Sequence, residues 1–111
     1  MPEAAIAVVA AFVLIALAKR ADARLPRAER LPMQWSLTGA VNWTAPRRVA
    51  LAFIPALGIS TLAMAAAGTR FFEPRPGQEG LEVPVMLALA MAFVGSYLLH
   101  LKLIERTLRR R

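Results

Sequence analysis

Residues 49–69 read VALAFIPALGISTLAMAAAGT, a run of 21 residues without a charged side chain. As a helix this run would be about 32 Å long at ~1.5 Å per residue, and the hydrocarbon core of a bilayer is ~30 Å thick. Two further uncharged runs, of 15 and 19 residues, occupy positions 4–18 and 83–101. The pattern predicts an all-α integral membrane protein, a single membrane domain over residues 1–111 with transmembrane helices at about 3–20, 46–69 and 83–103.

The composition of the 111-residue chain favours the same interpretation. Apolar residues make up 58% of the chain, whereas a soluble domain has about 45–50%. The first run is the shortest, and Lys19 and Arg20 extend it because long basic side chains reach the interface from within a span. The alternative is a signal peptide cleaved at Ala21-Asp22-Ala23, but the basic residues follow the apolar run instead of preceding it.

Basic residues are concentrated in two of the segments that flank the apolar runs. Positions 19–48 hold seven Lys and Arg against two acidic residues, and positions 102–111 hold five against one. Positions 70–82 hold two Arg against three Glu. The positive-inside rule therefore places the first loop and the C-terminus in the cytoplasm and the N-terminus outside, in a bacterial inner membrane. The net charge of +7 follows from this topology, and no nucleic-acid partner is expected.

The segment 25–45, between the first two predicted helices, has a different character. Apolar and polar residues alternate over residues 33–37 and again over residues 41–44, with Gly39 between the two stretches. Alternation around a glycine indicates a short hairpin, in which Trp35 and Trp43 would share one face. Indole rings favour the membrane interface. The segment is then either a surface loop anchored by tryptophan or a platform for a ligand or partner.

The motif LPMQWS at 31–36, with the residues that follow it, resembles the bacterial membrane family called domain of unknown function 1648. The same motif occurs at the N-terminus of SdpI-like immunity and signalling proteins, so the resemblance implies a peptide, toxin or regulator as partner. It also implies that the motif loop lies outside, in conflict with the charge distribution. Gln34 stands where the family usually has histidine, which argues against metal binding or proton transfer, and SdpI-like proteins carry further spans. The residues that carry the resemblance, and that would contact a partner, are Pro32, Gln34, Trp35, Gly39, Asn42, Trp43, Arg47, Arg48 and Pro55.

Two features of the apolar runs predict how the helices pack. Pro55 lies inside the second run and should kink it. Gly58, Ser60 and Thr61 follow, either to admit a neighbouring helix or to bond the backbone groups that the proline frees. In the third run Ala88, Ala92 and Ser96 recur every four residues, a pattern typical of close helix packing, either within the chain or between copies.

The residues that membrane enzymes and transporters need are scarce. The three apolar runs contain no Asp, Glu, Lys or Arg, the chain has no cysteine, and its single histidine, His100, is expected at the interface. No phosphate-binding loop, nucleophile elbow or metal-ligand spacing is present. We therefore expect no catalytic residue, metal or cofactor. Two classes of function remain: an interaction protein that binds a peptide or protein at the membrane, and an accessory subunit of a larger membrane complex.

Overall fold

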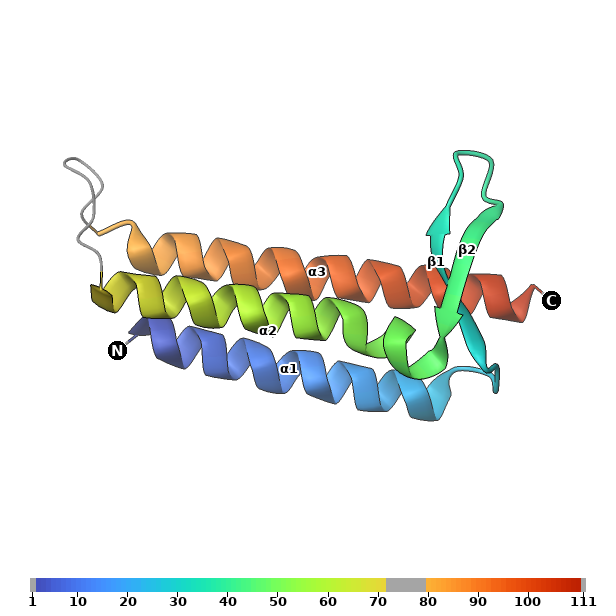
Figure 1. Cartoon of the computed structure of the whole chain (residues 1–111), viewed down its shortest axis with the longest axis horizontal. Coiled ribbons are helices and arrows are strands. Elements are labelled where there is room, and N and C mark those ends of the chain that lie inside the picture. Colours follow the sequence, from blue (N-terminus) through green and yellow to red (C-terminus); the bar gives the residue numbers. More distant parts are fainter. Residues whose placement is uncertain (1, 72–79, 111) are drawn as a thin grey trace.

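The computed structural model describes residues 2–71 and 80–110. Three long helices lie side by side, and α2 runs opposite to α1 and α3 (Figure 1). A small antiparallel sheet of two strands lies across one end of the bundle. The elements in order are α1 (Pro2–Arg24), β1 (Arg30–Trp35), β2 (Val41–Pro46), α2 (Arg47–Phe71) and α3 (Glu82–Arg109).

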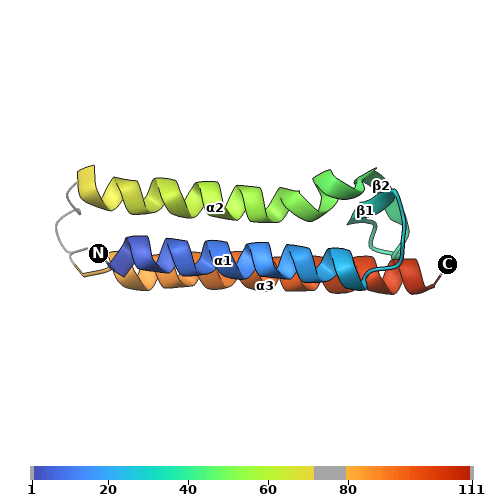
Figure 2. The same ribbon diagram turned by 90° about the horizontal axis from the view of Figure 1, so that it is seen from below.

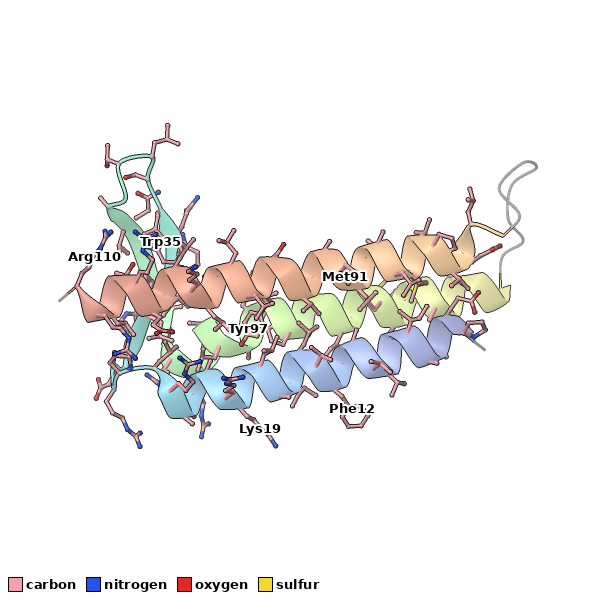
Figure 3. The ribbon with its side chains drawn as sticks, turned by 180° about the vertical axis from the view of Figure 1, so that it is seen from behind. Phe12, Lys19, Trp35, Met91, Tyr97 and Arg110 are labelled. Carbon is pink, nitrogen blue, oxygen red and sulfur yellow. The ribbon has the colours of Figure 1, made fainter. Side chains whose placement is uncertain are left out.

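The three predicted helices are confirmed, and each is long and apolar enough to cross a membrane. Large apolar side chains cover the outside of the bundle: Phe12 is 69% exposed, Met64 75% and Met91 74%. Figure 3 shows Phe12 pointing away from the other helices. The helix α3 continues to Arg109, six residues beyond position 103, where the third membrane span was predicted to end. Charged residues can end a membrane span without ending a helix.

The predicted hairpin is confirmed, so the fold is mostly helical and not strictly all-α. Gly39 has a φ of 88° in the turn, a conformation that favours glycine, and the Ser36 N–H donates to the Ala40 carbonyl at 2.8 Å. Two irregularities interrupt the strand pairing, one between Pro32 and Gln34 and one between Gln34 and Trp35. They disturb the regular alternation from which a shared face for the two tryptophans was predicted.

Two clusters of buried side chains hold the elements together. One, at the far end of the bundle from the hairpin, joins all three helices through Ala10, Leu62, Ala66 and Met86. The other joins the hairpin to the three helices. Its buried members are Ala21, Leu25, Leu31, Ala45, Ala50, Leu51, Ile104 and Leu108. The hairpin is therefore part of the core and not an appended loop.

The bend that Pro55 was expected to cause lies near the start of α2 (Figure 1). Proline has no N–H, so the carbonyl of Leu51, four residues earlier, loses its helical partner. The Tyr97 hydroxyl, which comes from α3, donates to that carbonyl at 2.7 Å, and Tyr97 is completely buried. The freed carbonyl is thus bonded by a neighbouring helix, and not by the nearby Ser60 or Thr61.

The two predicted packing features have different surroundings. A Cβ at Gly58 would lie 3.1 Å from Leu14 Cδ1 and 3.1 Å from Phe93 Cγ, so α1 and α3 approach α2 closely where it lacks a side chain. By contrast, Ala88, Ala92 and Ser96 are all exposed on α3. The small-residue stripe is therefore not a contact face within the described part of the chain.

Candidate functional site: the hairpin and its anchors

The Arg47 side chain fastens the base of the hairpin to the end of α1. Its Nε donates to Asp22 Oδ1 at 2.7 Å, and the side chain is only 15% exposed. Its two Nη atoms donate to the carbonyls of Asp22 at 3.0 Å, Pro26 at 3.0 Å, Ala28 at 3.3 Å and Leu25 at 3.4 Å. The last carbonyls of a helix have no partner within the helix, and positive charge is favourable there. A single guanidinium therefore caps α1 and shapes the connection 25–29.

The backbone completes this junction, since the Arg47 N–H donates to the Glu29 carbonyl at 2.7 Å. Asp22 is exposed and lies beyond the uncharged run of α1. The hydrogen bond from Arg47 lowers the pKa of this carboxyl below its ordinary value. The carboxylate consequently stays charged and available to Arg47 well into the acidic range.

The inner side of the hairpin is anchored on the extension of α3. The Trp35 indole N–H donates to Thr107 Oγ1 at 2.9 Å, and the Thr107 hydroxyl donates to the Leu103 carbonyl at 2.9 Å. The Trp35 ring also meets the His100 ring edge to face, with centroids 5.7 Å apart and planes at 76°. Figure 3 shows Trp35 where the hairpin crosses α3. Leu31 and Pro32 are buried beside this anchor.

The outer side of the hairpin presents a different set of groups. Gln34 and Trp43 are paired across the strands, and the Trp43 indole N–H donates to Gln34 Oε1 at 2.8 Å. Trp43 remains 50% exposed, and Leu37 at the tip is fully exposed. The prediction that both tryptophans share one face is therefore wrong: Trp35 is bonded to α3, and Trp43 is bonded to Gln34 and open to the surroundings.

The residues of the sequence motif thus divide into two groups. Pro32, Trp35, Gly39, Arg47 and Pro55 serve the fold, through burial, the anchor on α3, the turn, the cap on α1 and the bend in α2. Those at the exposed surface are Gln34, Asn42, Trp43 and Arg48.

Sequence reasoning missed two contacts of Trp35 with α3, the hydrogen bond to Thr107 and the ring contact with His100. The Nε2 atom of His100 is buried without a hydrogen-bond partner in the described part of the chain. The sequence signal that could have indicated packing on this part of α3 is the repeat of Leu101, Ile104 and Leu108 at helical spacing, because it continues the apolar face of α3 beyond the uncharged run.

The basic residues at the end of α1, the start of α2 and the end of α3 lie at the same end of the bundle as the hairpin (Figure 2). The ion pairs in the described residues join Arg47 to Asp22 and both Arg24 and Arg109 to Glu105. Within residues 2–71 and 80–110, no three His, Asp or Glu side chains are grouped so that they could hold a metal ion. The arrangement is suited to contacts with anionic and apolar groups.

Comparisons with family models, curated proteins and solved structures found no match. Function is therefore inferred from the hairpin and the bundle themselves. The resemblance to domain of unknown function 1648 stays a prediction.

Proposed function

We propose that the chain is a multi-pass membrane protein whose hairpin binds a peptide or protein partner at the membrane surface, as the resemblance to SdpI-like proteins implies. One observation carries the proposal: one side of the hairpin is anchored to α3 by the hydrogen bond from Trp35 to Thr107, and the other presents Trp43 and Leu37. An aromatic group held in place on a rigid backbone loses little conformational freedom when a partner binds.

Membrane insertion is supported by the apolar surface of the bundle. Residues such as Phe12, Met64 and Met91 would face water in a soluble protein, and lipid covers them in a spanning bundle. A helix bonds nearly all of its backbone polar groups internally, as a bilayer requires, and the carbonyl that Pro55 frees is bonded by Tyr97. The proposed location is the bacterial inner membrane, with the hairpin and the C-terminus in the cytoplasm because both lie at the basic end.

The surroundings of the hairpin indicate what kind of partner it would accept. Trp43 and Leu37 offer apolar contact area, while Arg48 supplies exposed positive charge at the start of α2. Arg30 is held along the hairpin by hydrogen bonds from its guanidinium to Thr44 Oγ1 and the Thr44 carbonyl, both at 2.9 Å. A peptide segment with both apolar and acidic side chains would complement this surface.

Site-specific photo-crosslinking tests the proposal in the producing cell. A photoreactive amino acid at Trp43 should yield a discrete crosslinked protein, whereas the same group at Phe12, on the outer surface of α1, should give lipid adducts. Replacing Leu37 with Asp should remove the product formed at position 43 without changing membrane retention. Identical products from positions 43 and 12, or no protein product at position 43, would contradict partner binding by the hairpin.

The accessory-subunit function remains a second candidate because the small-residue stripe on α3 is exposed. Packing in a larger complex or a homo-oligomer would cover Ala88, Ala92 and Ser96. Replacing Ala92 with Phe should then release the chain from its assembly, as measured by its size in mild detergent. A wild-type protein that purifies as a stable monomer would remove the support for this candidate.

A further inference from the structure

The helices α1 and α3 pack against each other and run in the same direction (Figure 2), and a groove follows the seam between them. Near the hairpin end it contains a cavity of about 210 Å³, and farther along the seam a second cavity of about 360 Å³. The residues that line both cavities come from α1, α3 and the residue that follows α1, and they recur every three or four positions. The two cavities therefore follow one continuous helical stripe on each helix.

The two cavities differ in chemistry. The far cavity is lined only by Ala, Ile, Val, Leu and Met side chains, including Val13 and Val94. The near cavity combines apolar residues such as Leu17 and Leu98 with three basic residues and one acidic residue. The groove is thus apolar along most of its length and polar at one end.

The polar end carries an excess of positive charge. Arg20, Arg24 and Lys102 line it, together with Glu105. Glu105 lies 4.0 Å from Arg24 and 3.1 Å from Arg109, so two guanidinium groups share this one carboxylate. In the described part of the chain, neither Arg20 nor Lys102 forms an ion pair. These two cations are free to bind an anion at the mouth of the groove.

The far cavity extends to Ala5, so the groove is longer than one leaflet is thick, and the part of it between Arg20 and Val9 matches one leaflet. Arg20 lies eleven residues from Val9, which is about 16 Å along a helix at ~1.5 Å per residue. Half of a ~30 Å hydrocarbon core is nearly the same depth. A molecule with an anionic group at the basic end and a hydrocarbon chain of leaflet length would match both the charge and the shape.

We propose that this groove binds one anionic phospholipid, with its phosphate between Arg20 and Lys102 and an acyl chain along Leu17, Val13 and Val94. Basic pockets between membrane helices bind lipid headgroups by this combination of charge and apolar contact. The inference rests on the proposed membrane location and is independent of any partner of the hairpin.

Native mass spectrometry in mild detergent tests the inference with dioleoylphosphatidylglycerol as the probe and dioleoylphosphatidylcholine as the zwitterionic reference. The wild-type protein should retain one phosphatidylglycerol in preference to phosphatidylcholine. The double variant Arg20→Gln/Lys102→Gln should bind phosphatidylglycerol about tenfold more weakly, since each basic residue contributes to binding anionic lipid. Leu98→Trp, which fills the near cavity, should weaken binding without a change in charge.

The matched control is Lys19→Gln/Arg48→Gln, which removes the same charge from a different cavity, lined by α1, α2 and Arg27. It should leave phosphatidylglycerol binding within about twofold of the wild type, because neither residue lines the groove between α1 and α3. Equal losses in the two double variants, or equal retention of both lipids, would overturn the inference. Competition by glycerophosphoglycerol alone, at concentrations equal to the lipid, would overturn it in favour of a phosphate site.

Alkaline carbonate extraction of the same variants separates this inference from the proposed function. A protein that stays in the membrane but shows no preference for phosphatidylglycerol contradicts the lipid site alone. A protein that carbonate removes from the membrane contradicts the membrane location, and the lipid site with it.

Discussion

The hydrogen bond from Tyr97 to the Leu51 carbonyl gives the sharpest stability prediction. Replacing Tyr97 with Phe keeps the buried ring but removes the hydroxyl, so the carbonyl freed by Pro55 has no donor. Leaving a buried polar group unbonded costs about 1–3 kcal/mol, and hydrogen bonds between membrane helices contribute about 0.6–1.7 kcal/mol. We expect Tyr97→Phe to lower the free energy of unfolding by about 1–2 kcal/mol.

A double-mutant cycle with Pro55→Ala isolates this contribution. Alanine restores the N–H that can bond the Leu51 carbonyl within α2, so the Tyr97 hydroxyl becomes dispensable. Tyr97→Phe should then cost less than about 0.5 kcal/mol in the Pro55→Ala background, leaving a coupling energy of about 1 kcal/mol. Reversible unfolding in mixed micelles of a mild detergent and dodecyl sulfate, followed by circular dichroism, measures all four proteins. Equal losses in the wild-type and Pro55→Ala backgrounds would refute the reasoning.

Two further predictions concern the junction and the helix contact. Arg47→Lys should destabilise the protein by about 2 kcal/mol, because an ammonium group cannot reach the five acceptors that the guanidinium bonds. Faster hydrogen exchange of the backbone amides in 25–29 reports this loss. The control Arg48→Lys, at an exposed side chain, should change neither the free energy of unfolding nor the rate of exchange. Gly58→Val should cost about 1–3 kcal/mol in the same unfolding assay, because its methyl groups would overlap Leu14 and Phe93. Gly95→Val is the matched control, since a Cβ there meets nothing within 4 Å; a loss as large as that at Gly58 would show that the contact is not the cause.

The helices and the hairpin could be predicted because their signals are local. Uncharged runs of membrane length, and alternation on either side of Gly39, need no knowledge of the rest of the chain. The third span was predicted to end at 103, and the helix continues to Arg109, because Lys102 and Arg106 end an apolar run while Ile104 and Leu108 continue its buried face beneath the hairpin.

The surroundings of the two tryptophans could not be predicted in the same way. The irregularities in strand pairing arise where the hairpin fits against the helices, and a period-two pattern does not reveal them. In the sequence, Pro55 indicates a backbone carbonyl without a donor, and Tyr97 indicates a hydroxyl that needs an acceptor. Their pairing depends on which turns of α2 and α3 face each other, and the bonded residues, Leu51 and Tyr97, lie 46 positions apart.

The central claim is that three spans place the hairpin at the cytoplasmic surface of a membrane. Because the chain has no cysteine, single cysteines at Thr38, at the hairpin tip, and at Leu81, beside the start of α3, report the two ends of the bundle. An impermeant thiol reagent applied to intact cells should label position 81, and should label position 38 only after the membrane is permeabilised. Labelling of position 38 but not position 81 in intact cells would contradict this orientation, and labelling of both would contradict a bundle that spans the membrane.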